Sequence, residues 1–340
     1  MYELLIRRYT DFMEEAEGWG TKTVDSKLYS LDIILLQYKG DLKKLSPKKL
    51  IKLKNELREY EVNGKKLSLK RIRRILNDIS KFLTWLSFQP GYKSRIQPDL
   101  ISYLSLNNEE MAMTYISKIR EFPILENVLR QCELITINNI IDKRDRAIFA
   151  FLICYGVRNE ALRSLRLGSI DRISLELHQS PLDGVRTKFT KKIDTFCFRF
   201  HPKLVGYIQE WVETLYKLGY SQSDPLFPLS KLRVSNNGGF DKRTDIVKDF
   251  MKSASTLNKI LKDRADQYGV RYFSSHCFRH SCAYHALRCV EDAHQLKAVS
   301  QQFGHKTIAL VLTTYGNLSI YQQRDAIESM NFESKNKFKF

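Results

Sequence analysis

Apolar residues recur at intervals of three and four positions along the first quarter of the chain. The spacing is clear from 23 to 38, from 46 to 60 and again from Ser68 onward. A period near 3.6 residues places such positions on one side of a helix, so each segment is predicted to form an amphipathic helix. In the third helix, the residues of the core-facing stripe are Ile72, Ile75, Leu76, Ile79, Phe82, Leu83 and Leu86.

The helical pattern is interrupted after Leu86. Gln89-Pro90-Gly91 follows the third helix, and another proline at position 98 precedes the return of periodicity near Asn108. Proline and glycine at this density are typical of a linker between domains. The predicted organisation is a helical domain over 1–88, a linker over 89–108, a second domain over 109–330 and a C-terminal tail over 331–340.

The second domain is predicted to be mainly helical with one small antiparallel sheet. Between Asp171 and His201 the apolar period changes to two, and Asp183-Gly184 is a turn candidate, so a hairpin or three-stranded sheet is expected. The alternating positions are Ile173, Leu175 and Leu177, then Phe196, Phe198 and Phe200. Helices are expected at 109–120, 123–132 and 143–155, and another is expected to end at about Arg166. Further helices are expected at 203–219, 244–267, 277–289, 292–303 and 319–330.

The charge of the chain is strongly positive. Lys and Arg number 56 against 38 Asp and Glu, a formal net charge of +18, which suits nucleic acid or an anionic membrane surface. Residues 41–74 hold 13 Lys and Arg but 4 Asp and Glu, so half of the excess lies in a tenth of the chain. We expect this segment to contact DNA, and a solvated helix face is the alternative. The cations expected at the third helix are Lys70, Arg71, Arg73 and Arg74.

No segment of the sequence is predicted to lie in a membrane. The longest uninterrupted apolar run, 147–157, is shorter than the roughly 20 residues that a spanning helix needs, so it is predicted to be a buried helix. Charges follow Met1 too quickly for a secretory signal, and a cytoplasmic, nucleoid-associated protein is expected. The six cysteines are scattered without the dense spacing of a disulfide scaffold, which favours reduced, mostly buried thiols.

Five side chains in the second domain suggest a site that acts on phosphate. They are Arg158, His276, Arg279, His305 and Tyr315, in chain order. Guanidinium groups can hold a phosphodiester and stabilise the charge that develops on it, imidazoles can transfer protons, and a phenol can attack phosphorus. The residue types therefore indicate DNA strand cleavage through a tyrosine.

The first turn of the helix near 277–289 carries two of these groups. His276 and Arg279 are three residues apart, so they share one helix face, and Ser275 could cap the helix. His280 falls off that face and is expected to be structural. An alternative makes His276, His280 and Cys282 zinc ligands, although no fourth ligand has a convincing spacing.

Three ordered motifs resemble those of the tyrosine recombinases, or phage integrase family. They are Tyr155-Gly-Val-Arg158-Asn-Glu-Ala-Leu-Arg-Ser-Leu, then Ser275-His276-Cys-Phe-Arg279-His280-Ser281, then Phe303-Gly304-His305 followed by Tyr315. The similarity extends over roughly 110–330 and includes Asp224-Pro-Leu-Phe227-Pro228, whereas the N-terminal helices resemble the core-binding domain more loosely. The resemblance implies two domains, a helical core-binding domain and a mixed α/β catalytic domain, that form a clamp around duplex DNA.

The resemblance also implies a role for each matching residue. Tyr315 attacks the scissile phosphate, forms a 3′-phosphotyrosyl link and releases a 5′-hydroxyl. Arg158, Arg279 and His305 hold the phosphate, and His276 assists proton transfer. No metal and no nucleotide cofactor are required, because the phosphotyrosine preserves the energy of the ester.

The family also uses a lysine on the β-hairpin to protonate the leaving 5′-oxygen. Lys188 fits this role best through its place before the final strand, and Lys191 and Lys192 are close enough in sequence to compete for it. The sequence departs from the family pattern at Ala161, where an acidic residue is common three positions after the first arginine, and Glu160 stands one place early.

The spacing of the final motif is a second departure. Tyr315 follows His305 about one residue later than is usual in the family, which keeps Tyr321 as a reserve nucleophile. The predicted function is a site-specific DNA recombinase or integrase, acting on double-stranded DNA as a dimer on one site and a tetramer in synapsis. The alternatives are a catalytically inactive sequence-specific DNA-binding protein and a topoisomerase of the same tyrosine chemistry, resembling type IB.

Overall fold

The computed structural model divides the chain into two compact units, Met1–Arg120 and Glu121–Phe340. The structure describes residues 2–38, 41–115, 121–231, 233–234, 240–241, 245–304, 307–309, 312 and 320–329. Within these ranges, no helix combines the length and the apolar character that crossing a bilayer requires.

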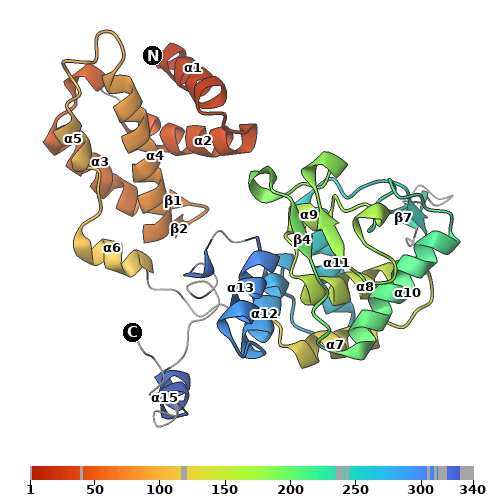
Figure 1. The fold of residues 1–340 in the computed structure, drawn as a ribbon. Coiled ribbons are helices and arrows are strands. Elements are labelled where there is room, and N and C mark those ends of the chain that lie inside the picture. Colours follow the sequence, from red (N-terminus) through yellow and green to blue (C-terminus); the bar gives the residue numbers. More distant parts are fainter. Residues whose placement is uncertain are drawn as a thin grey trace. The chain divides into compact units, whose positions relative to one another are not determined.

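The first unit is a set of amphipathic helices around one apolar core (Figure 1). Its helices are α1 (Glu3–Asp11), a π-helical turn (Phe12–Ala16), α2 (Thr21–Gln37), α3 (Pro47–Glu59), α4 (Leu69–Ser87), α5 (Pro98–Ser102) and α6 (Asn108–Tyr115). The Ser68 side chain caps α4 by accepting a hydrogen bond from the amide of Arg71. All seven residues of the predicted stripe on α4 are buried, so this prediction is confirmed.

The segment 89–108 differs from the linker that the sequence indicates. Pro98 occupies the first turn of α5, where a missing amide donor has little cost. Ile96, Leu100 and Leu104 are buried in the core of the first unit. Glycine and proline interrupt the helices here, but the apolar residues between them still pack, and the boundary between the units falls after Arg120.

Helix α8 (Ile140–Tyr155) forms the centre of the second unit and packs against α7 (Leu125–Leu134), α10 (Pro202–Lys217) and α12 (Ser275–Arg288) (Figure 1). Asn139 and Asp142 close a capping box at its start, and every residue from 147 to 155 is buried. The apolar run predicted to form a buried helix over 147–157 is helical and buried as far as Tyr155, where α8 ends. Among the described residues, the other α-helices of this unit are α9 (Asn159–Leu162), α11 (Ala254–Gln267), α13 (Ala293–Gln302) and α15 (Ile320–Glu328).

Short antiparallel strand pairs complete both units. They are β1 (Glu61–Val62) with β2 (Lys65–Lys66), β3 (Leu177–Gln179) with β4 (Ile193–Thr195), β5 (Leu229–Ser230) with β8 (Ile246–Val247), and β6 (Arg233–Val234) with β7 (Phe240–Asp241). The helix expected over 244–267 begins only at Ala254, because β8 pairs with β5 and Ser253 caps α11. The predicted mainly α architecture with small antiparallel sheets is confirmed.

The β3–β4 hairpin is shorter than the alternating pattern suggests. Leu177 pairs with Thr195 and Gln179 with Ile193, whereas Ile173 is 86% exposed and lies outside the strands. Beyond Thr195 the chain leaves β3, since the amide of Phe198 donates to the carbonyl of Cys154 at the end of α8. The segment that follows β4 is therefore bound to the C-terminal end of α8.

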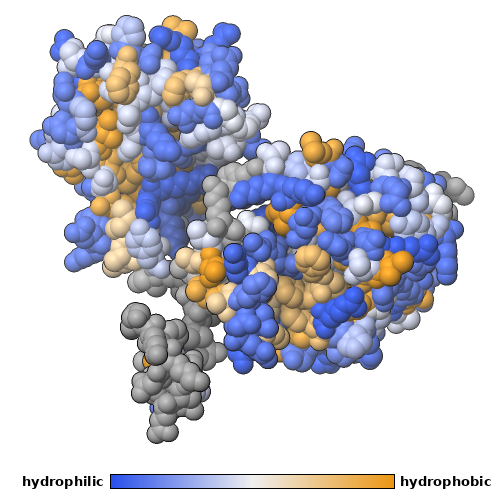
Figure 2. Space-filling model, in the orientation of Figure 1, coloured by the Kyte–Doolittle hydropathy of each residue, from blue (hydrophilic) through white to orange (hydrophobic). Residues whose placement is uncertain are grey.

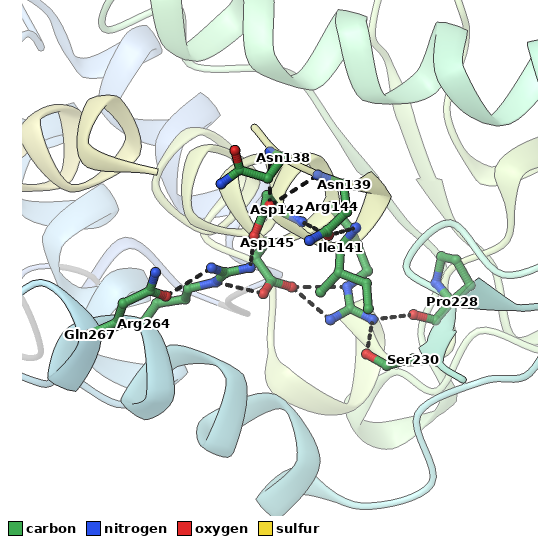
Figure 3. A network of polar contacts seen from close by, with 10 residues as sticks. All are labelled: Asn138, Asn139, Ile141, Asp142, Arg144, Asp145, Pro228, Ser230, Arg264 and Gln267. Atoms are coloured by element: carbon green, nitrogen blue, oxygen red, sulfur yellow. Dashed lines mark hydrogen bonds and ion pairs between the residues drawn. The ribbon is translucent and has the colours of Figure 1, made fainter. Parts of the chain in front are cut away.

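A buried network of charges joins the start of α8 to α11 and β5 (Figure 3). The Asp145 carboxylate accepts from Arg144 at 2.7 Å and from Arg264 at 2.8 Å, and Arg264 also donates to Asp142 at 2.6 Å. Arg144 donates further to the carbonyl of Pro228. Because each buried charge meets an opposite charge, the network can exist in the interior without an uncompensated ion.

Hydrophilic residues cover most of the visible face of each unit, with apolar residues scattered among them (Figure 2). The six cysteines are free thiols, of which Cys132, Cys154 and Cys282 are buried and Cys289 is exposed. The sequence predicts mostly buried thiols and half of them are fully buried, while their reduced state stays a prediction.

Candidate active site

Arg158 stands where the chain turns out of the core after α8. Gly156 ends that helix in the left-handed conformation at φ 57°, and Arg158 then occupies the N-cap position of α9. Its guanidinium Nη2 lies 3.5 Å from the carbonyl oxygen of Phe303. The half-buried side chain thus leaves the core and points to the end of α13.

Arg279 reaches the same carbonyl from the second turn of α12. Its Nη2 donates to the Phe303 oxygen at 2.7 Å and its Nη1 to the Gly156 oxygen at 2.6 Å. Arg279 is 4% exposed, and its guanidinium carbon lies 4.8 Å from the centre of the Phe303 ring. Two arginines that are 121 positions apart in the sequence therefore converge on one backbone oxygen.

The turn after α13 brings a third motif to these arginines. Gly304 has a φ of 62°, and a Cβ at this position would lie 2.7 Å from Ile193 Cδ1 and 3.9 Å from Arg158 Nη1. The chain therefore passes tightly between β4 and Arg158 immediately before His305. His305 and Tyr315 themselves lie outside the residues that the structure describes.

His276 is exposed on the first turn of α12, three residues before Arg279. Its Nε2 lies 3.1 Å from Nε2 of His280, and the two rings meet edge to face. The sequence interpretation set His280 apart as structural, whereas the structure places its buried ring against His276. Two imidazole nitrogens at this distance can share a proton.

The alternative of a zinc site gains no support from Cys282. This residue is fully buried and its sulfur faces Gly156 in the core. Burial raises the pKa of the Cys282 thiol, which disfavours the thiolate that binds a metal. Among the described residues, no group of three or more His, Cys, Asp or Glu side chains is placed to hold a metal ion.

A neutral polar bridge joins the first two motifs, and sequence reasoning missed it. The side chain of Asn159 donates to Ser275 Oγ at 2.8 Å, and Ser275 in turn contacts Asn258 Oδ1 at 3.3 Å. Ser274, rather than Ser275, is the N-cap of α12. The sequence offered only one signal for this bridge, namely that Asn159 adjoins Arg158.

Lys188 lies on the connection between β3 and β4, in a short 3-10 turn, Lys188–Thr190, and its side chain is exposed. The Thr187 hydroxyl donates to the Lys191 carbonyl at 2.6 Å, which closes the loop around this turn. The amide of Arg186 donates to Ser164 Oγ at 2.8 Å, and Ser164 follows α9. The loop is thus anchored to the element that carries Arg158, while the choice among the hairpin lysines stays a prediction.

Comparison with known proteins identifies this arrangement. The sequence profile described as the phage integrase family matches residues 127–320, more than half of the chain and the part that contains all three motifs. The chain belongs to the phage integrase family, the tyrosine recombinases. A search of curated protein sequences finds no significant match.

Solved structures of two integrases and of a site-specific recombinase share the fold at low sequence identity. A lambda integrase dimer bound to a core site matches with a TM-score of 0.59 and 14% identity, covering 92% of this chain and 94% of that one. The Tn1549 transposon integrase in complex with circular intermediate DNA matches with a TM-score of 0.59 and 13% identity over 95% and 98%. XerH bound to a palindromic difH substrate matches with a TM-score of 0.57 and 16% identity over 92% and 80%.

One departure from the integrase family pattern has a structural counterpart. Ala161 is 2% exposed and packs in the core, so this position offers no charge to the site. Glu160 is exposed at the preceding position. The bridge from Asn159 to Ser275 supplies a neutral polar connection between the two arginine motifs instead.

The four cations predicted to contact DNA are on the N-terminal half of α4 in the first unit. Lys70 and Arg74 are exposed, and Arg74 also donates to Ser26 Oγ at 2.7 Å. Arg73 is partly buried, donates to Tyr115 and lies 5.0 Å from its ring centre, and Arg71 lies 5.4 Å from the ring of Tyr29. Residues Lys70, Arg73, Arg74 and Asn77 line a cleft of about 480 Å³.

Proposed function

We propose that this integrase is a site-specific DNA recombinase that cleaves and rejoins strands through Tyr315. The observation that carries the proposal is the convergence of Arg158 and Arg279 on the Phe303 carbonyl. Both positive charges lie beside the turn that leads into His305, although the residues come from three separate parts of the sequence. A phosphodiester is anionic and gains charge in the transition state, so such a cluster can both bind it and accelerate its cleavage.

The proposed reaction exchanges one phosphodiester bond for another of similar energy. The Tyr315 oxygen attacks phosphorus and loses its proton to a neighbouring base, for which His276 is the proposed group. The bond from phosphorus to the 5′-oxygen breaks, and Lys188 donates a proton to that oxygen. Attack by a 5′-hydroxyl on the phosphotyrosine reverses these steps and rejoins the DNA, so neither a metal nor a nucleotide is consumed.

Double-stranded DNA is the proposed partner of both units. The related lambda and Tn1549 integrases were solved bound to DNA. The exposed Lys70 and Arg74 on α4 suit phosphate contacts, and replacing either one by alanine should reduce the salt dependence of binding by about one counterion. We propose a dimer on one site and a tetramer in synapsis, and a location at the nucleoid.

A covalent-trapping experiment tests the function. The duplex that the protein selects from a random-sequence pool is prepared with a nick, so that the cleaved fragment diffuses away and the phosphotyrosine persists. Wild-type protein and the Tyr321→Phe control should form the covalent adduct, and Tyr315→Phe should form none. The proposal is wrong if the wild type binds without cleaving, which is the behaviour of an inactive DNA-binding protein, or if Tyr315→Phe still forms the adduct.

Plasmid relaxation separates the remaining alternative. A topoisomerase with the same chemistry relaxes supercoiled DNA whether or not the selected site is present. The proposed recombinase should relax or recombine only plasmids that carry the site.

A further inference from the structure

We propose that Gln302 is a positioning residue for strand cleavage, because its side-chain amide aligns the Lys188 loop with the two arginines. The inference rests on the proposed function and deepens it. Gln302 is the last residue of α13 and is 9% exposed. Neither the sequence motifs nor the polar bridge at Asn159 includes it.

The side chain of Gln302 binds both backbone groups of a single residue. The amide of Phe196 donates to Gln302 Oε1 at 2.9 Å, and Gln302 Nε2 donates to the carbonyl of Phe196. An adjacent antiparallel strand satisfies a residue in this same paired manner. Gln302 therefore replaces a neighbouring strand at the point where β4 has just ended.

This contact joins two parts of the site that the sequence separates by about a hundred residues. On one side, β4 begins at Ile193, shortly after the loop that carries Lys188. On the other side, Gln302 directly precedes Phe303, whose carbonyl lies within reach of both arginines. Since β3 and β4 share only three residue pairs, the hairpin depends on contacts at its other edge to keep its position.

The packing of Gly304, two residues after Gln302, supports the same alignment. A Cβ on Gly304 would lie 2.7 Å from Ile193 Cδ1, so the turn and β4 are in close contact. The hydrogen bonds of Gln302 set the register of the strand along this contact. A shift of β4 would move the Lys188 loop relative to the phosphate held by the arginines, and proton transfer requires hydrogen-bond distance.

Glutamine is suited to this role by its shape and by its two kinds of polar atom. Leucine has a similar size but offers no hydrogen bond, and glutamate can accept from the Phe196 amide but cannot donate to the carbonyl when ionised. Both variants keep much of the side-chain volume. The neighbouring Gln301 is exposed and makes neither of these bonds, so Gln301→Leu is a matched control.

The test compares DNA affinity with single-turnover cleavage on the nicked substrate. Gln302→Leu and Gln302→Glu should bind DNA within about twofold of wild type and cleave it at least about tenfold more slowly, whereas Gln301→Leu should do both normally. Circular dichroism and a thermal melt of each variant report whether it folds. Wild-type cleavage rates in both Gln302 variants would overturn the inference.

A second substrate distinguishes alignment of the proton donor from a general loss of structure. In a 5′-bridging phosphorothiolate, sulfur replaces the leaving oxygen and departs as a thiolate without needing a proton. The defect of Gln302→Leu should therefore shrink to about twofold on this substrate, whichever hairpin lysine is the acid. An equal defect on both substrates would overturn the inference, whereas failure of the wild type to form an adduct would overturn the proposed function itself.

Discussion

Replacing Gly156 by alanine tests how tightly the arginine site is built. Gly156 has a φ of 57°, and a Cβ there would lie 2.5 Å from Phe303 Cε1 and 2.9 Å from Cys282 Sγ. Real Cβ atoms do not approach other heavy atoms so closely, and Phe303 is 1% exposed with little room to move. The Gly156 carbonyl also accepts from Arg279, so any displacement reaches the site directly.

The expected loss in the free energy of unfolding has two parts. A non-glycine residue in the left-handed region costs about 1 kcal/mol, and overpacking of a filled core costs about 1 to 3 kcal/mol. We therefore expect Gly156→Ala to lower the free energy of unfolding by about 2 to 4 kcal/mol. Gly219 is a matched control, because it has a φ of 72° while no described atom lies within 4 Å of its Cβ position. Gly219→Ala should carry only the backbone part, about 1 kcal/mol.

Urea unfolding of the full chain measures the free energy of unfolding of both variants. Hydrogen exchange of peptides from α8 and α10 shows whether the change occurs in the second unit. Single-turnover cleavage is measured in parallel, and Gly156→Ala should be the slower of the two because Phe303 and Arg279 move together. Equal destabilisation by the two substitutions would refute the reasoning, since it would mean that Phe303 does not pack tightly on Gly156.

Two other predictions follow from hydrogen-bonded polar groups in the second unit. Asp145→Asn removes the carboxylate shared by Arg144 and Arg264 and should lower the free energy of unfolding by about 3 kcal/mol. If urea unfolding shows a loss below about 1 kcal/mol, the network does not contribute as proposed. Burial lowers the pKa of His285, whose neutral Nε2 accepts from the Leu125 amide at 3.1 Å. The stabilisation of the fold by neutral His285 should be complete above pH 6.5, the ordinary pKa of histidine, and should be lost as the pH falls below that value. Hydrogen exchange of the Leu125 amide, corrected for intrinsic exchange, measures this effect. Unchanged protection of that amide from about pH 8 to about pH 5 would disprove the prediction.

Local sequence patterns were sufficient for the main core helices and for the family. The stripe on α4 and the apolar run of α8 follow from residues a few positions apart, where helical geometry alone determines which side chains share a face. The three motifs are also local, and each carries its own arginine or histidine. For this reason the residue types of the site and the mainly helical fold could be predicted from the sequence.

Local patterns were insufficient where short segments gain structure from distant partners. The prolines and glycines around 89–108 indicate interruption, but they do not show that Ile96 and Leu104 still pack in the first core. Likewise, the alternation at Phe196 and Phe198 predicts a longer strand. The structure ends β4 earlier, because Gln302 and the end of α8 bind the backbone there.

The sequence by itself determined which chemical groups this integrase carries and in what order. Only the tertiary structure decided how they meet, through the packing of Phe303 against Gly156, the bridge from Asn159 to Ser275 and the bonds from the Gln302 amide to Phe196. Each of these contacts joins residues about a hundred positions or more apart. Such contacts depend on how whole helices pack against each other, and no periodicity within one segment encodes that packing.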